Sequence, residues 1–325
     1  MIVTRTPLRV SFFGGGSDIP QFYETNPGLV ISTTIDRYIQ IAVNRCEPKH
    51  VRVVYSELEQ ADHVDQIKHT RAKAVLKRFN VQTGIEIASF SDITTKGSGL
   101  GSSSSYTVGL INAMYNLKVL GYNRRDLAES ACDIEIKDLC EPIGKQDQYA
   151  AAYGGFNSIR FDGNDVEVTP VPVTHSTLAI LNERLMCFST GMTRQTSSIL
   201  DQQVKNLKDN QSTVESTARL VDMADTALRY LKDIRLDDFG SLLHDGWMEK
   251  KKLASSISNP HIDSMYESAR RAGALGGKIL GAGGGGYMLL YVPSVQARNN
   301  VRTALKEYRQ FYFRFTDQGS VATQV

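Results

Sequence analysis

The chain has 325 residues, of which 41% are hydrophobic and 22% charged, as is typical of a folded globular protein and not of a disordered one. Because one domain rarely exceeds about 200 residues, we expect two domains that share an interface. Lysine plus arginine (37) nearly balance aspartate plus glutamate (35). The resulting net charge of +2 gives no reason to expect a nucleic-acid partner.

The sequence shows no membrane or export signal. Its N-terminal segment lacks the apolar core of a signal peptide, and no run reaches the roughly 18 apolar residues that a membrane span needs. The four cysteines, Cys46, Cys132, Cys140 and Cys187, have neither CxxC nor metal-ligand spacing. We therefore expect a cytoplasmic protein with reduced thiols and no membrane partner. The oligomeric state stays open.

Strand and helix patterns are mixed in the first predicted domain, residues 1–170. Apolar and β-branched runs predict strands over 30–35, 39–43, 51–55 and 84–90. Apolar residues at helical spacing predict helices over 66–79, 102–120 and 123–140, with Gly121 ending the second of them.

The pattern breaks over 162–177, where Gly163, Pro170 and Pro172 lie in a polar stretch, and we place a domain boundary there. The second predicted domain, residues 171–325, begins with a strand over 178–189. Helices are predicted over 198–231, 238–257, 260–272 and 294–308, and strands over 278–280, 287–292 and 311–315. The charge run 249–252 is interpreted as a solvated helix face.

Glycines gather in three stretches, and the middle one is the most informative. Glycine permits positive φ, so backbone N–H groups can converge on an anion, and a helix that begins directly afterwards turns the positive end of its dipole toward that anion. A flexible linker is the alternative, but a linker would not lie between an apolar strand and an amphipathic helix. The stretch is not a Walker A loop. We expect a phosphate-binding loop made of Gly97, Ser98, Gly99, Leu100, Gly101, Ser102, Ser103 and Ser104.

The other two stretches carry different signals. In the first, residues 6–18, Arg9 lies on a strand from which it can reach an anion, and Asp18 follows three glycines and can accept hydrogen bonds from hydroxyls. A surface arginine and a turn aspartate are the alternative reading. The third stretch, residues 279–288, holds more glycine than a hairpin needs. It predicts a close approach of the backbone to a ligand or to another loop.

Two carboxylates complete the candidate chemistry. Asp147 lies in the segment I-G-K-Q-D-Q at 143–148, where a carboxylate can serve as base for a hydroxyl nucleophile, although an ordinary helix N-cap is equally compatible. Glu135 lies twelve residues earlier on the preceding predicted helix, where it suits a metal ion.

Taken together, the three motifs in this order resemble those of the GHMP kinase superfamily, which includes galactokinase, homoserine kinase and mevalonate kinase. The run G-L-G-S-S-S at 99–104 is the most specific part of this resemblance, which extends over the whole chain. The resemblance implies an α+β fold with two domains, an N-terminal one like domain 2 of ribosomal protein S5 and a ferredoxin-like C-terminal one. ATP and Mg²⁺ would bind in the cleft between them.

The resemblance also implies roles for single residues. Residues Gly97 to Ser104 would surround the ATP phosphates, Ser103 and Glu135 would bind Mg²⁺, and Asp147 would be the catalytic base paired with Arg9. Galactokinases carry G-E-H-x-D where this chain has G-G-G-S-D at 14–18, which argues against galactose.

Within the superfamily, three segments look like the branch of heptose 7-phosphate kinases and related fucose kinases. They are S-F-F-G-G-G-S-D at 11–18, S-T-T-I-D at 32–36 and S-T-G-M-T-R at 189–194. That branch implies phosphorylation of the anomeric 1-hydroxyl of D-glycero-D-manno-heptose 7-phosphate to the 1,7-bisphosphate, for nucleotide-activated heptose and surface polysaccharide synthesis. The expected substrate-binding residues are Arg9, Gly15, Gly16, Asp18, Lys145, Asp147, Thr193 and Arg194, with Arg194 and its rival Lys145 as candidates for the distal phosphate.

Three alternatives compete with this function. An L-fucose-type or other sugar 1-kinase would act on an acceptor without a phosphate, and a catalytically silent regulator would bind sugar or nucleotide on the same fold. A dinucleotide oxidoreductase is disfavoured because no G-x-G-x-x-G with a later ribose-binding acid is present.

Overall fold

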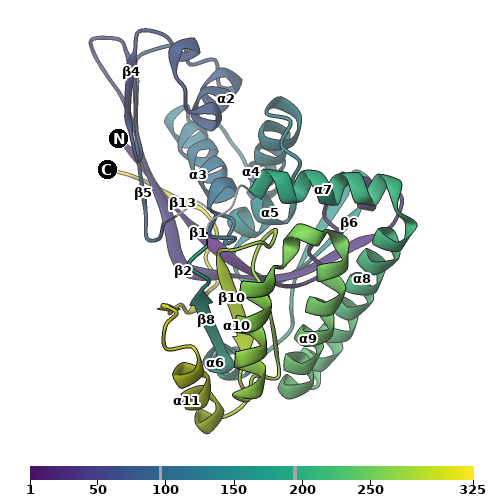
Figure 1. The fold of residues 1–325 in the computed structure, drawn as a ribbon. Helices are drawn as coiled ribbons and strands as arrows, with labels where there is room; N and C mark the ends of the chain where they lie inside the picture. The colour runs from purple at the N-terminus through teal and green to yellow at the C-terminus, as the bar shows by residue number, and fades with distance from the viewer. Residues whose placement is uncertain (95–96, 193–195) are drawn as a thin grey trace.

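The computed structural model describes residues 1–94, 97–192 and 196–325, and it shows an α+β protein built on two sheets (Figure 1). The larger sheet has its main path in the order β13-β1-β2-β5-β3-β4, with β6, β7 and β12 attached to it through β2 and β6. Its strands are β1 (Ile2–Phe13), β2 (Gly28–Arg45), β3 (Val51–Val54), β4 (Leu58–Ala61), β5 (Ile85–Ser91), β6 (Phe156–Asp162), β7 (Asp165–Pro170), β12 (Phe315–Thr316) and β13 (Val321–Gln324).

The two strands predicted over 30–35 and 39–43 form a single strand, β2. The polar residues between them stay extended because the backbone there has partners: Asp36 N–H donates to Arg314 O at 2.8 Å, and Ile35 pairs with Phe315. The register of β1 against β2 shifts between Pro7 and Leu8. Proline offers no N–H to the ladder, so an irregularity is expected at this point.

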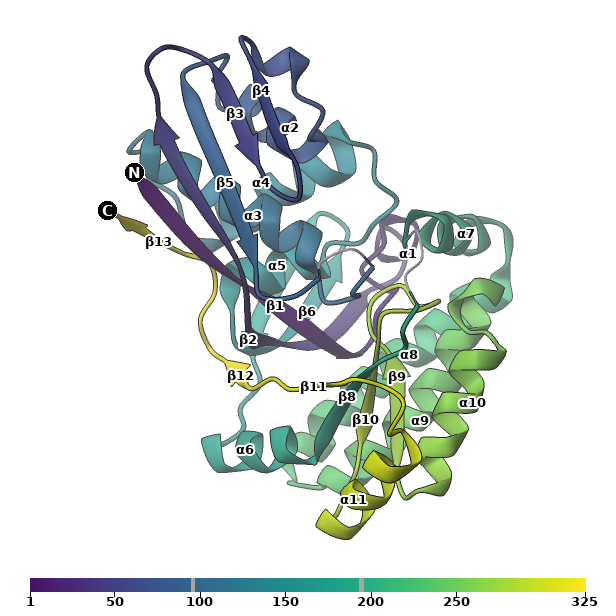
Figure 2. The same ribbon diagram turned by 60° about the vertical axis from the view of Figure 1, so that its left-hand side comes forward.

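Helices cover one face of this sheet (Figure 2). They are α2 (Thr70–Arg78), α3 (Ser102–Leu117), α4 (Arg124–Cys132) and α5 (Gln146–Tyr153), while the short α1 (Pro20–Tyr23) follows β1 and η1 (Val64–Gln66) precedes α2. The helix predicted over 123–140 changes at Asp133 into a π-helical turn, η2 (Asp133–Asp138). Asn123 caps α4, with its side-chain oxygen accepting from Asp126 N–H at 3.0 Å. The π-turn is the segment that carries Glu135.

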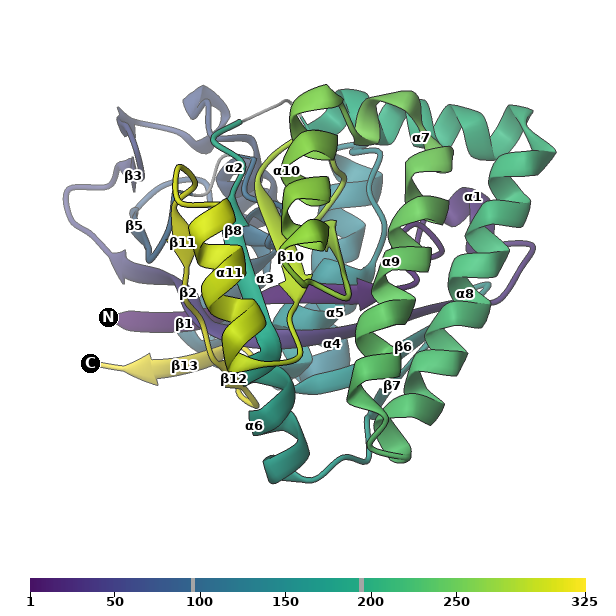
Figure 3. The ribbon, with the colours of Figure 1, turned by 60° about the horizontal axis from the view of Figure 1, so that its bottom comes forward.

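The smaller sheet has the order β11-β8-β10-β9 and is covered by the C-terminal helices (Figure 3). Its strands are β8 (Leu185–Ser189), β9 (Gly276–Ile279), β10 (Tyr287–Tyr291) and β11 (Gln310–Phe311). The helices are α6 (His175–Arg184), α7 (Thr196–Asp209), α8 (Gln211–Lys232), α9 (Leu236–Leu253), α10 (Pro260–Arg271) and α11 (Val295–Ala304), with η3 (Ser255–Ile257) after α9.

Three predictions of secondary structure for this half were wrong. The helix predicted over 198–231 is divided at Asn210 into α7 and α8. Residues 178–184 belong to α6 and not to a strand, because Thr174 caps a helix there and Leu181 turns into the core. The predicted strand over 311–315 is instead two short strands in different sheets, β11 and β12. Short apolar runs do not distinguish helix from strand by periodicity alone.

The two halves are joined by more than the linker between them. β7 ends at Pro170, next to the boundary placed from the sequence, but the C-terminal strand returns to pair with β1, with Ile2 opposite Gln324. Apolar packing is continuous across the junction, where the Phe13 and Phe239 rings lie 5.1 Å apart. No described helix combines the length and apolar character needed to cross a membrane.

Candidate active site

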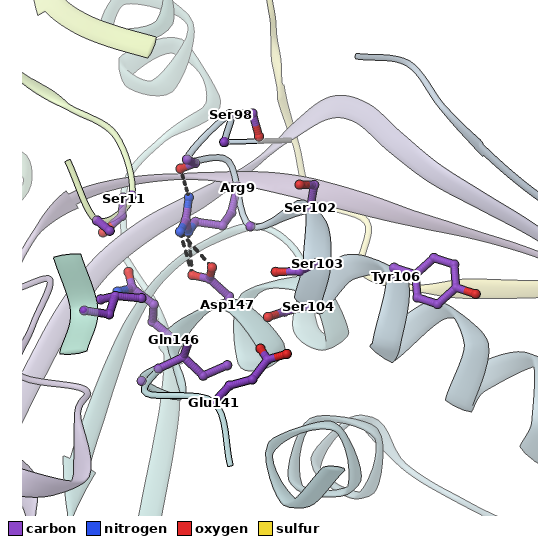
Figure 4. Close-up of a pocket in the computed structure, with 18 of the residues that line it drawn as sticks. Arg9, Ser11, Ser98, Ser102, Ser103, Ser104, Tyr106, Glu141, Gln146 and Asp147 are labelled. Atoms are coloured by element: carbon purple, nitrogen blue, oxygen red, sulfur yellow. Dashed lines mark hydrogen bonds and ion pairs between the residues drawn. The ribbon is translucent and has the colours of Figure 1, made fainter. Parts of the chain in front are cut away.

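A cavity of about 970 Å³ lies where the two halves meet. All three glycine-rich stretches contribute to its wall, together with residues of α5, α7 and α9. Figure 4 shows side chains of the first stretch, of the middle stretch and of α5 around this cavity. Segments that are far apart in the sequence therefore converge on one site.

The middle glycine-rich stretch forms a loop directly before α3. Gly97, Gly99 and Gly101 have φ of 70°, 73° and 75°, and α3 then begins at Ser102. Ser103 is exposed toward the cavity and Ser104 is buried. The loop and the helix N-terminus together present backbone N–H groups and a positive dipole end, as an anion site requires.

The N-cap of α3 is Gly101, with no side-chain hydrogen bond, and the serines that follow it lie in the first turn of the helix. Of the eight predicted loop residues, only Leu100 does not line the cavity. Its side chain is in the core, and its carbonyl accepts Arg9 N–H at 3.0 Å.

The third glycine-rich stretch, residues 279–288, packs against the loop formed by the middle stretch. A Cβ on Gly99 would lie 2.3 Å from Leu280 O, and a Cβ on Gly281 would lie 2.6 Å from Gly99 Cα. The expected close approach to another loop is therefore confirmed. Only glycine fits at these two positions, because the opposing atoms belong to backbone and cannot turn away.

Arg9 and Asp147 form a two-pronged ion pair at the floor of the cavity (Figure 4). Arg9 Nε donates to Asp147 Oδ1 at 2.7 Å and Nη2 to Oδ2 at 2.8 Å, while Nη1 donates to Gly99 O at 2.6 Å. The Arg9 side chain is 5% exposed and that of Asp147 23%, so the carboxylate remains open to the cavity. Asp147 lies in the first turn of α5, and Lys145, not Asp147, occupies the N-cap position.

Glu135 is fully buried and accepts four hydrogen bonds. The donors are Ser104 Oγ at 2.8 Å, Thr107 Oγ1 at 2.6 Å, Gln148 Nε2 at 2.6 Å and Arg71 Nε at 3.1 Å. These occupy about all the lone pairs of a carboxylate.

The serine that contacts Glu135 is thus Ser104, and no described contact joins Glu135 to Ser103. A second carboxylate, Glu141, also pairs with Arg71 and does line the cavity. Desolvation raises the pKa of Glu141, while the positive charge of Arg71 opposes this shift.

Asp18 also lines the cavity, beside the first turn of α5. Its carboxylate accepts from Gly16 N–H at 3.0 Å, Gln146 N–H at 3.2 Å and Gln146 Nε2 at 3.1 Å. Burial raises its pKa, and these backbone hydrogen bonds act in the opposite direction. A Cβ on Gly144 would lie 2.0 Å from Asp18 Oδ2, so the glycine before α5 leaves room for this carboxylate.

The buried Ser11 Oγ and Gln146 Oε1 have no hydrogen-bond partner among the described residues. Both residues line the cavity together with Asp18, Gly15 and Gly16. Unpaired polar atoms of this kind suit the hydroxyls of a bound sugar.

Of the two candidates for the distal phosphate, only Lys145 lies among the described residues. The Lys145 ammonium lies 4.5 Å from the centre of the Tyr23 ring, and Lys145 does not line the cavity. Thr193 and Arg194 lie outside the described residues, so their role stays a prediction.

Sequence reasoning missed two groups of cavity residues. The charge run 249–252 predicted a solvated helix face, but Lys250 is 7% exposed, and Lys278 on β9 is 6% exposed. Lys250 is spaced from the buried Trp247 and Leu253 so that all three lie on one face of α9, and this spacing was the sequence signal for its burial.

The second group is aromatic: the His69 ring lies 4.7 Å from that of Tyr55 and 4.8 Å from that of Tyr106.

Comparison with known proteins agrees with this geometry. Residues 67–155 match the model of the GHMP kinases N terminal domain, and residues 227–309 match that of the GHMP kinases C terminal domain. The chain is 30% identical to the D-glycero-alpha-D-manno-heptose 7-phosphate kinase of Campylobacter jejuni, over 98% of this chain and 97% of that protein. The chain belongs to the GHMP kinase family. It is therefore a phosphotransferase with a hydroxyl acceptor, as the motifs predicted.

Two further proteins align with nearly the whole of this chain. The solved structure of a D-glycero-D-manno-heptose 1-phosphate kinase from Bacteroides thetaiotaomicron superimposes with a TM-score of 0.83 at 24% identity, covering 100% of this chain and 99% of that one. The bifunctional fucokinase/GDP-fucose pyrophosphorylase of Arabidopsis thaliana is 24% identical over 94% of this chain, which corresponds to 31% of that protein. The predicted two-domain GHMP kinase fold is confirmed.

Proposed function

We propose that this GHMP kinase transfers the γ-phosphoryl group of ATP to the anomeric 1-hydroxyl of D-glycero-D-manno-heptose 7-phosphate and releases the 1,7-bisphosphate. The observation that carries this proposal is the Arg9–Asp147 pair, which lies between the phosphate loop at Gly97–Ser104 and the polar wall formed by Asp18 and Gln146. The named activity of the Campylobacter relative supports the choice of acceptor.

In this mechanism Asp147 positions the acceptor hydroxyl and takes its proton. Its carboxylate stays partly open to the cavity, so a lone pair not used by Arg9 remains for the hydroxyl. Arg9 fixes the orientation of the carboxylate and offsets the charge that develops during transfer. Phosphoryl transfer depends mainly on such positioning and charge stabilisation, since little other covalent chemistry is asked of the protein.

The nucleotide would extend from the loop toward the aromatic end of the cavity. Tyr55, His69 and Tyr106 lie there, and the buried Tyr106 hydroxyl has no hydrogen-bond partner among the described residues. Flat aromatic rings and an unpaired hydroxyl suit a purine base, while the loop amides and the N-terminus of α3 suit the phosphates.

The residues present also fit Mg²⁺, which prefers hydroxyl and carboxylate oxygens. Ser103 faces the cavity, and Glu135 lies behind the loop in contact with Ser104. Because four donors fill the Glu135 carboxylate, one of its hydroxyl partners would have to turn for it to hold a metal, whereas Glu141 already faces the cavity. When bound, the ion would neutralise phosphate charge.

The acceptor would lie against Gly15, Gly16 and Asp18. The buried polar atoms Ser11 Oγ and Gln146 Oε1 would hydrogen-bond its hydroxyls. The bisphosphate product would feed the synthesis of nucleotide-activated heptose for surface polysaccharide, and we place the enzyme in the cytoplasm. An L-fucose-type 1-kinase is the second candidate, because fucokinases are among the relatives that align with nearly the whole chain.

Coupled ADP release against a panel of sugars and sugar phosphates tests the proposal. We expect kcat/KM for the heptose 7-phosphate to exceed that for the unphosphorylated heptose and for L-fucose by at least about tenfold, the effect of one lost charge-assisted contact. Equal or faster turnover of L-fucose or of the free heptose would refute the proposed acceptor and favour the second candidate. Omitting Mg²⁺ and exchanging ATP for GTP in the same assay tests the cofactors.

A further inference from the structure

Two buried lysines stand out among the residues that line the cavity. Lys250 lies on α9 and Lys278 on β9, and both side chains belong to the C-terminal half of the fold. They are 7% and 6% exposed, yet neither forms an ion pair with a carboxylate among the described residues. Buried ammonium groups are normally paired, because an unpaired charge loses its hydration without compensation.

The hydrogen bonds of the two ammonium groups leave donors unused. Lys250 Nζ donates to Ile279 O at 3.2 Å and to Gly281 O at 2.5 Å, and Lys278 Nζ donates to Phe12 O at 2.8 Å. Each ammonium has three N–H groups. Within the described part of the chain, one donor of Lys250 and two of Lys278 therefore have no acceptor.

The surrounding charges do not balance these two cations. Arg9 adds a third positive charge nearby, and its guanidinium group is already paired with Asp147. Asp18 is the acid whose charge acts on both lysines, and its carboxylate is already occupied by Gly16 and Gln146. Burial, together with the charge of Arg9, lowers the pKa of Lys250 to about 7, and burial, together with the charges of Lys250 and Arg9, lowers the pKa of Lys278 well below its ordinary value. An anion bound here would supply the missing negative charge.

We propose that Lys250 and Lys278 bind the phosphate group of a sugar phosphate acceptor, which deepens the proposed function and rests on it. Both lysines line the same cavity as Asp18, Gly15 and Gly16, against which the acceptor would lie. The Asp18 carboxylate is close enough for its charge to act on both ammonium groups. An acceptor whose 1-hydroxyl faces Asp147 would therefore find two cations for its phosphate in the same part of the cavity.

The γ-phosphate of ATP is the other source of a phosphate dianion at this place, and acceptor choice separates the two. We would measure kcat/KM for the heptose 7-phosphate and for the unphosphorylated heptose in the wild type, Lys250→Met, Lys278→Met and Lys252→Met. Lys252 lies on the same helix as Lys250 with a side chain that is 56% exposed, so it is the matched control.

The expected result is a fall of about 10- to 100-fold in the preference for the phosphorylated acceptor in each buried-lysine variant, as for loss of a charge-assisted contact. The control should keep the wild-type preference. Equal losses with both acceptors would mean that the lysines serve ATP or the loop, and would overturn the proposal. If the wild type itself shows no preference, the proposed function fails instead.

A measurement on the wild type covers the case in which the variants do not fold. Titration calorimetry at about pH 8, in two buffers of different ionisation enthalpy, reports protons taken up on binding. A phosphate dianion at Lys250 should restore its proton, so the heptose 7-phosphate should bind with net proton uptake and the free heptose without it. The charged groups that face Lys250 are Arg9, Asp18 and Lys278. No difference in uptake between the two sugars would overturn the proposal.

Discussion

Arg9 and Asp147 are 138 positions apart in the sequence, and their side chains meet through two parallel hydrogen bonds of 2.7 and 2.8 Å. Arg9 lies on β1, within the first glycine-rich stretch, and Asp147 lies in the first turn of α5. The third donor of Arg9 binds the carbonyl of Gly99, so the phosphate loop is part of the same unit. A change in any one of the three should disturb the other two.

Replacing Asp147 by asparagine keeps the shape of the side chain but removes the anionic acceptor. We expect kcat to fall by about 10²- to 10⁴-fold, the usual contribution of a general base, while the dissociation constant of ATP changes little. Single-turnover kinetics and nucleotide titration measure the two quantities. Asp209→Asn, at the exposed end of α7, is the control. A fall in kcat of less than about threefold would reduce Asp147 to a structural member of α5.

Substitutions can show which of Ser103, Glu135 and Glu141 bind Mg²⁺. Ser103→Ala and Glu135→Gln should each raise the Mg²⁺ concentration needed for half-maximal activity, and the double variant should show less than additive effects because both act on one ion. Glu141→Gln is the informative comparison, since Glu141 faces the cavity and Glu135 does not. If only Glu141→Gln changes the Mg²⁺ dependence, the carboxylate ligand is Glu141 and the assignment of Glu135 is wrong.

Gly99 is the position at which the phosphate loop tolerates least change. A Cβ there would lie 2.3 Å from Leu280 O, and its φ of +73° disfavours any other residue. Gly99→Ala should lower the free energy of unfolding by about 1–3 kcal/mol and raise KM for ATP by about tenfold or more, because the loop must move. Chemical denaturation and steady-state kinetics test both effects.

Gly121→Ala is the matched control for this substitution. A Cβ at Gly121 would meet nothing within 4 Å, and no strained φ occurs there. We expect its stability and KM to remain near the wild-type values. If the Gly99→Ala variant were as stable and as active as the Gly121→Ala variant, the packing of the two loops against each other would be contradicted.

The buried Lys250 predicts a pH dependence of stability whose sign can be worked out. Its folded-state pKa of about 7 lies below the value of about 10.4 for an unfolded lysine. Between these two values the unfolded chain binds the extra proton, so the free energy of unfolding should rise with pH, by up to about 1.4 kcal/mol per pH unit. The stability that Lys250 contributes at high pH is therefore lost as the pH falls toward and through about 7. The shift for Lys278 has the same sign.

Urea denaturation of the ligand-free protein between about pH 7 and 9.5 measures this slope. Lys250→Met should flatten it, and Lys252→Met, with its exposed side chain, should not. A variant of Lys250 that keeps the full wild-type slope would show that Lys250 is not the group that titrates.

The sequence by itself determined the features that depend on local backbone geometry. The three glycine-rich stretches could be located because positive φ at positions such as Gly97 and Gly101 is a property of single residues. Most helices could be placed because apolar spacing is local too, and Asn123 marks the start of α4 by capping chemistry. The family followed from the order of these motifs, and it was confirmed.

Only the tertiary structure decided which side chains lose water and which charges meet. Lys250 looks solvated in the run E-K-K-K and is buried because β9 and the Gly281 loop pack over that face of α9. Glu135 contacts Ser104 because α3 and the π-turn approach each other in that register, which no spacing along the chain encodes. Residues 178–184 form α6 since a cap at Thr174 and burial of Leu181 outweigh an ambiguous apolar run. Burial and pairing are long-range quantities, so they depend on elements that are distant in the sequence and meet only in the folded chain.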